Sequence, residues 1–104
     1  MDYRLETSAE FERDMGEALN HISNKLLNLS AASSLSKKVR RKISFIQTNP
    51  FMYPRYHDKR IKSANFRYAV VDNYLLFYHV DEATNVISIE AFVYGKQDLT
   101  AIIK

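Results

Sequence analysis

The sequence predicts a two-layer α+β fold, in which an N-terminal strand and a helical hairpin pack on an antiparallel sheet in the order β-α-α-β-β-β. Residues 11–29 and 32–46 carry apolar side chains at three- and four-residue steps, the spacing of two amphipathic helices. Residues 66–71, 74–80 and 86–94 are rich in Val, Ile, Tyr and Phe and are separated by short polar turns, which is typical of an antiparallel meander. Two helices that bury their stripes on one sheet face leave the opposite face for function.

The elements before the meander have recognisable starts and stops. Residues 3–6 alternate apolar and polar side chains, as a short half-buried strand does. Thr7 followed by Glu10 has the pattern of a capping box, so the first helix should begin there and continue until about residue 29. Ser30 is expected to cap the second helix, and Pro50 should stop it.

Length and composition limit the class of protein. With 104 residues, the chain is expected to fold as one domain, residues 1–104. It has no cysteine, which excludes disulfides and thiolate chemistry. It shows no export signal and no long apolar run, so a cytoplasmic protein without membrane contact is expected. Because the sequence has no His-x-x-x-His motif, no clustered Asp and no glycine-rich phosphate loop, we expect neither a metal site nor a cofactor.

Charge is concentrated in the middle of the chain. Residues 36–67 hold ten basic and one acidic side chain, a net charge of +9, whereas residues 1–35 and 68–104 each carry −3. A locally positive surface attracts nucleic acid or an acidic protein segment, and a solvated helix face is the competing interpretation. Half of these cations lie on the second helix, off its apolar stripe: Lys37, Lys38, Arg40, Arg41 and Lys42.

Four of the other cations lie in residues 50–65, and the fifth is Arg67. Residues 50–65 show neither period and contain both prolines, so this segment is interpreted as a loop. Its cations alternate with Phe51, Tyr53 and Tyr56, a mixture that suits phosphate contacts with base stacking and equally suits aromatic anchors on the core. The candidates for target or RNA binding are therefore Arg55, His57, Lys59, Arg60, Lys62, Arg40, Arg41 and Tyr94.

Four local patterns point to a known family. Pro50 closes the second helix and Tyr53-Pro54 follows it; Phe66-Arg67 places a cation after an aromatic residue at a strand start; residues 72–80 read DNYLLFYHV; and residues 94–98 read YGKQD. The third pattern is similar to the N-Y-x-x-x-Y-x-V strand of the RelE/ParE superfamily, and the fourth resembles the basic G-R-R-D that ends its sheet. The chain thus resembles toxins of type II toxin–antitoxin systems.

The resemblance implies a cognate antitoxin whose acidic or amphipathic segment wraps the toxin and blocks it. RelE-like members cleave messenger RNA in the ribosome, whereas ParE-like members inhibit DNA gyrase and catalyse nothing. The target would therefore be the ribosome with its mRNA, or DNA gyrase. A homodimer and a heterotetramer with the antitoxin are both compatible with the family.

Cleavage of RNA requires a base, cations and an acid at one phosphate. By the resemblance, Arg67 and Lys96 are the candidate cations, and a strand or loop histidine, His79 or His57, is the candidate acid or base. Two positions at which RelE-like nucleases carry further cations hold Ala69 and Leu75, and the tail has no tyrosine near its close. The incomplete set favours ParE-like, non-nucleolytic action. A RelE-like mRNA endonuclease and an inactive homologue that only binds RNA or protein are the alternatives.

Each candidate also has a structural interpretation. A strand-borne Arg67 presents a rigid fork to a phosphate or a carboxylate, but it could equally pair with an acidic neighbour such as Glu90. His79 could be an ordinary strand residue. Tyr74 and Tyr78 are spaced for one strand face, which favours packing over catalysis.

Overall fold

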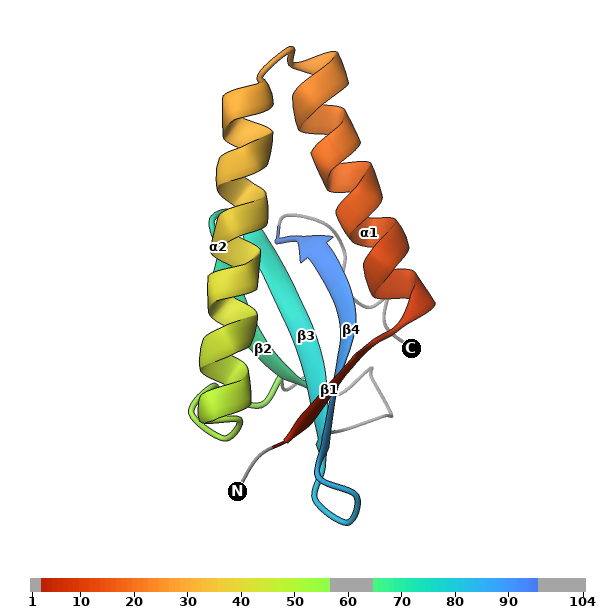
Figure 1. Cartoon of the computed structure of the whole chain (residues 1–104), viewed down its shortest axis with the longest axis vertical. Coiled ribbons are helices and arrows are strands. Elements are labelled where there is room, and N and C mark those ends of the chain that lie inside the picture. The colour runs from red at the N-terminus through yellow and green to blue at the C-terminus, as the bar shows by residue number, and fades with distance from the viewer. Residues whose placement is uncertain (1–2, 57–64, 96–104) are drawn as a thin grey trace.

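The structure, a computed structural model, describes residues 3–56 and 65–95. It has the predicted order of elements, with two long helices standing side by side against a sheet (Figure 1). The elements are β1 (Arg4–Thr7), α1 (Ala9–Asn20), a π-helical turn η1 (His21–Lys25), α2 (Leu29–Thr48), β2 (Arg67–Val71), β3 (Tyr74–Asp81) and β4 (Val86–Tyr94). In this part of the chain, no helix combines the length and apolar character needed to cross a membrane.

The sheet has the strand order β1-β4-β3-β2. Strands β2, β3 and β4 form the predicted antiparallel meander, while β1 adds to the outer side of β4 in the parallel direction, with Arg4 opposite Val86. Between β3 and β4 the register shifts, because Phe77 pairs with Ala91 and Tyr78 pairs with Ile89. Glu90 is thus the extra residue of a β-bulge.

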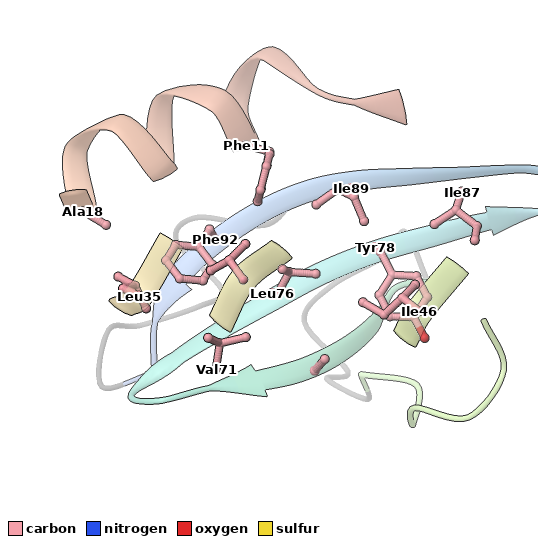
Figure 2. Close-up of a cluster of buried hydrophobic side chains, with 12 residues drawn as sticks. Phe11, Ala18, Leu35, Ile46, Val71, Leu76, Tyr78, Ile87, Ile89 and Phe92 are labelled. Atoms are coloured by element: carbon pink, nitrogen blue, oxygen red, sulfur yellow. The ribbon is translucent and has the colours of Figure 1, made fainter. Parts of the chain in front are cut away.

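Both helices cover one face of this sheet, as Figure 2 shows for the side chains between them. Phe11 and Ala18 come from α1, and Leu35, Val39 and Ile46 come from α2. Burial of one such aliphatic or aromatic side chain stabilises the fold by about 1.5–3 kcal/mol. The sheet contributes Ala69, Val71, Leu76, Tyr78, Ile87, Ile89 and Phe92.

The start of α1 differs by one residue from the predicted capping box. Ser8 is the N-cap: its Oγ accepts a hydrogen bond from the Phe11 N–H at 3.0 Å, and its hydroxyl donates to the Glu90 carbonyl at 2.8 Å. Thr7 is the last residue of β1, and its hydroxyl donates to a Glu12 carboxylate oxygen. Because the strand occupies Thr7, the next hydroxyl residue takes the cap.

The turn between the helices also departs from the prediction. Regular α-helix ends at Asn20, the π-helical turn follows, and Leu27 has a left-handed backbone (φ 51°) that stops the helix. The side chain of Asn28, not that of Ser30, caps α2 by accepting from the Ala31 N–H at 3.0 Å. The end of α2 at Thr48, before Asn49 and Pro50, is as predicted.

The tip of the hairpin extends past the end of the sheet (Figure 1). Leu26, Leu27 and Leu29 are 61%, 84% and 73% exposed there. The apolar spacing of the sequence predicts Leu26 and Leu29 on the buried stripe. They are exposed because no strand lies beneath that part of the helix pair.

Asp14 fastens α1 to the bulged strand. Strand β1 pairs with β4 from Val86 to Ile89, and farther along β4 the Phe92 N–H donates to the Asp14 Oδ2 at 3.0 Å. We expect Asp14→Ala to lower the free energy of unfolding by about 1–3 kcal/mol, because a partly buried amide loses its acceptor. Urea denaturation measures the change. Asp14→Asn keeps an oxygen acceptor and should cost clearly less; equal costs for both variants would assign the effect to charge instead.

Candidate functional site

A groove of about 240 Å³ runs between α2 and the edge strand β2. Phe45 and Val70 are half exposed in it, at 51% and 53%. Lys38 bridges the groove to Asp72 with an Nζ–Oδ1 distance of 3.0 Å. The remaining lining residues are Arg41, Lys42 and Val71. The groove therefore combines cations with exposed apolar side chains.

One side of this groove is the edge of β2, which the described residues cover only in part. The Tyr56 N–H donates to the Phe66 carbonyl at 2.8 Å, and the Tyr68 N–H donates to the Pro54 carbonyl at 3.1 Å. A short piece of chain around Arg55 thus pairs beside the first half of β2. In an antiparallel ladder, alternate residues direct their backbone groups to the same side, so the N–H and C=O of Val70 point outward as those of Tyr68 do.

Arg67 lies on the helix side of the sheet and holds the loop after α2. Its guanidinium donates to the Tyr53 carbonyl at 2.7 Å and lies over the Phe51 ring, 5.1 Å from the centroid. The strand partner of Arg67 is Tyr78, whose buried hydroxyl donates to the Pro50 carbonyl at 2.6 Å. Within the described residues Arg67 contacts this loop and forms no ion pair with Glu90 or another carboxylate.

The environment of Tyr78 fixes its protonation state. Burial raises the pKa of the Tyr78 phenol to about 12, and the positive charge of Arg67 offsets only part of that increase. The pKa of Tyr74 is also raised, first by burial and then by Tyr94. At neutral pH, Tyr78 is therefore a hydrogen-bond donor and not a base.

The structure separates two of the predicted catalytic residues. His79 follows Tyr78 in β3, so it lies on the sheet face opposite to Tyr78 and Arg67, where it is half-buried. The third candidate, Lys96, lies outside the described residues. Arg67 and His79 cannot act on the same phosphate from opposite faces of the sheet.

The candidates for target binding are spread over several surfaces. Arg40 and Arg41 are exposed on α2, and Arg55 is exposed beside β2. Tyr94 is half-buried at the end of β4, with its ring 5.6 Å from that of Tyr74, which stacks in turn on Phe92. His57, Lys59, Arg60 and Lys62 lie outside the described residues.

The sheet face away from the helices, which the sequence left free for function, carries a second apolar cluster. Phe77, Ala91 and Val93 are buried there. Tyr56 packs edge-on against Phe77, with ring centroids 5.1 Å apart, so it is an anchor of the loop and not an open platform for bases. The partly buried members are Tyr56, Phe66, Tyr68 and Leu75.

Two features of the structure are not among the sequence predictions. The exposure of Phe45 and Val70 could have been predicted from the sequence. Phe45 lies outside the apolar stripe of its helix, and Val70 alternates with the core-facing residues of its strand. A cavity of about 740 Å³ under the helical hairpin, which Asp14, Glu17 and His21 help to line, has no such signal in the sequence. In the described ranges, no three His, Asp or Glu side chains come together as metal ligands.

A sequence model of the family described as "ParE toxin of type II toxin-antitoxin system, parDE" matches residues 5–99. No curated protein matches the chain. Among solved structures, the chain is similar to one in the chromosomal ParDE TA system from P. aeruginosa, with a TM-score of 0.68 and 11% identity over 88% of this chain and 95% of that one.

Two further structures share the fold. One is in the E. coli DinJ-YafQ toxin-antitoxin complex, with a TM-score of 0.63 and 13% identity over 90% of this chain and 93% of that one. The other is in the archaeal RelE-RelB complex from Pyrococcus horikoshii OT3, with a TM-score of 0.59 and 12% identity over 94% of this chain and 100% of that one. At these identities the similarity shows the fold alone.

Proposed function

The chain belongs to the ParE toxin family of type II toxin–antitoxin systems, and we propose that it arrests growth by a ParE-like, gyrase-type action on DNA replication. Solved structures with ParE-like and with RelE-like names share its fold. The fold therefore does not distinguish gyrase inhibition from mRNA cleavage, and the proposal rests on the side chains.

The contacts of Arg67 carry the proposal. A RelE-like cut needs a cation and a base or acid directed at one phosphate. Arg67 directs its guanidinium at the Tyr53 carbonyl and the Phe51 ring, and His79 lies on the opposite sheet face. The Arg67 guanidinium contacts the loop instead of facing an open surface. This supports a toxin that acts by binding its target and not by cleaving RNA.

Induction in growing bacteria, with pulse labelling of DNA and protein synthesis, tests the mechanism. We expect DNA synthesis to fall first and the purified protein to inhibit supercoiling by purified gyrase. Arrest of translation first, with cut messages, would instead establish the RelE-like endonuclease. Unchanged growth with a folded protein would identify an inactive homologue.

We also propose that a cognate antitoxin neutralises the chain by seating an extended acidic segment in the groove between α2 and β2. The outward N–H and C=O of Val70 can pair with a further strand, and Lys38 and Lys42 can meet its carboxylates. Phe45 supplies an apolar anchor from α2, and the exposed Val70 side chain, on the other face of β2, can pack beside a strand added to this edge. A second copy of the chain would bring the same cations to this edge, and like charges disfavour such pairing.

Val70→Asp is expected to weaken antitoxin binding by about tenfold or more, because it sets a carboxylate against an acidic segment. Calorimetric titration with the purified cognate antitoxin measures the change. Thr84→Asp adds the same charge at the exposed turn between β3 and β4 and serves as the control. If both variants bind as the wild type does, the antitoxin segment does not occupy this groove.

A further inference from the structure

The outer surface of α2 carries a row of cations that have no counter-charge among residues 3–56 and 65–95. The helix Leu29–Thr48 carries five basic side chains and no acidic one. Two of the five are engaged, because Lys38 pairs with Asp72 and Lys42 lies over the Tyr53 ring at 5.4 Å. In the described part of the chain, Lys37, Arg40 and Arg41 are exposed and form no ion pair.

Helical geometry gathers these three cations on one face. Lys37 and Arg40 are three residues apart and Lys37 and Arg41 are four apart, so the side chains are neighbours on the helix surface. Lys37 and Arg40 lie opposite the buried positions Leu35 and Val39, on the side of α2 that faces away from the sheet, and Arg41 lies between this side and the groove, which it also lines. We call this surface the outer α2 face; it comprises Ser33, Lys37, Arg40, Arg41 and Ser44.

The three neighbouring cations repel one another, and a bound anion would weaken this repulsion. Like charges three and four residues apart destabilise a helix. A polyanion that contacts the outer α2 face would remove this repulsion and release the counterions held on its own phosphates. Since the helix is fixed by its buried face, the cations are presented on a rigid element.

The composition of the face selects the class of partner. Protein interfaces are anchored by apolar and aromatic side chains, and the exposed aromatic residue of α2, Phe45, lines the groove beside β2 instead. The outer α2 face offers Lys, Arg and Ser, which are the side chains that contact phosphate and sugar in protein–DNA complexes. It is therefore suited to a nucleic-acid backbone more than to a protein.

We propose that the outer α2 face binds the phosphate backbone of duplex DNA without sequence preference. The proposal deepens the function proposed above, because a toxin that acts on replication meets its target on duplex DNA. The phosphates of a duplex provide one negative charge per roughly 1.7 Å of axis, and the rise from Lys37 to Arg41 is about 6 Å. Two or three phosphates would thus lie within reach of the three cations.

Fluorescence anisotropy with a labelled 20-base-pair duplex tests the proposal. The variant Lys37→Ser/Arg40→Ser/Arg41→Ser removes the cations of the outer α2 face. The control Arg4→Ser/Arg13→Ser/Lys25→Ser removes the same charge from exposed positions elsewhere. At low salt, we expect the first variant to bind at least tenfold more weakly than the wild type and the control to change by less than about threefold.

The dependence on salt gives a second measurement. The slope of log K against log salt concentration should decrease in magnitude by about 2–3 in the outer-face variant, because each phosphate contact contributes about 0.9. Equal losses in both variants would show attraction by overall charge and would overturn the proposal. Tighter binding to single-stranded RNA of the same sequence, or to polyglutamate, would overturn it too, in favour of RNA or an acidic protein.

Failure of this proposal and failure of the proposed function have different signatures. A wild-type protein that stops DNA synthesis but does not bind the duplex refutes the DNA-binding face and leaves the toxin mechanism standing. A protein that binds the duplex through α2 but leaves DNA synthesis unchanged refutes the gyrase-type mechanism alone. Circular dichroism of both triple variants confirms that the exposed substitutions leave the fold intact.

Discussion

Tyr78→Ala is expected to lower the free energy of unfolding by about 3–5 kcal/mol, as large-to-small substitutions of buried aromatic residues do. The Tyr78 side chain is 0% exposed and belongs to the core cluster between the helices and the sheet. The substitution removes the ring and also the hydroxyl that donates to the Pro50 carbonyl. Chemical denaturation followed by circular dichroism measures the loss, and a shortfall in folded protein on expression should accompany it.

Tyr78→Phe separates the two contributions. The ring stays, but the Pro50 carbonyl loses its donor, so we expect a loss of about 1–3 kcal/mol. If this variant were as stable as the wild type, water would be replacing the hydroxyl and the hydrogen bond would not hold the loop. If it were as unstable as Tyr78→Ala, packing of the ring would be negligible, contrary to its burial.

Arg67→Ala is expected to lower the free energy of unfolding by about 1.5–3 kcal/mol, because the Tyr53 carbonyl loses a charged donor. Growth arrest should persist at a level set by the amount of folded protein. Arg67→Lys should recover only part of the stability. The lysine ammonium can donate to the carbonyl, but it lacks the flat guanidinium group that lies over the Phe51 ring. Denaturation and induced-growth assays, both normalised to folded protein, give the comparison.

A catalytic role for Arg67 would produce another pattern. Arg67→Ala would then be nearly as stable as the wild type yet would no longer arrest growth or cut messages. That result would contradict both the structural role of the guanidinium and the preference for a ParE-like mechanism. The two readouts together therefore decide which role Arg67 has.

The sequence predicted the fold class because the periodicities of its helices and strands are strong and uninterrupted. It could not place β1, since a four-residue strand contains no information about which neighbour it joins or in which direction. It also overextended the first helix, because Leu26 and Leu29 continue the apolar spacing past the end of the sheet. Helical periodicity reports which face is apolar, but not how far the opposing surface reaches.

The candidate site was harder to predict, although two signals were present. Arg67, Ala69 and Val71 share one face of β2, and the apolar pair on that face marks it as the side under the helices. Strand β3 is apolar on consecutive positions rather than alternate ones, which indicates a strand buried on both faces. Its outer face was therefore never an open surface. The hydrogen bonds from Arg67 and Tyr78 to loop carbonyls have no sequence signal, because any residue supplies a carbonyl.

The position of β1 beside β4 has a consequence for the order in which the molecule is made. Arg4 pairs with Val86, so β1 is made well before β4 and waits for it before it gains its neighbour in the sheet. The strand residues Ile87, Ile89 and Phe92, which form part of the core with α1, are made equally late. Contacts so distant in sequence form slowly, since a long loop must close first. A nascent toxin should therefore stay inactive until β4 has been made, which gives an antitoxin already present in the cell time to meet it as it folds.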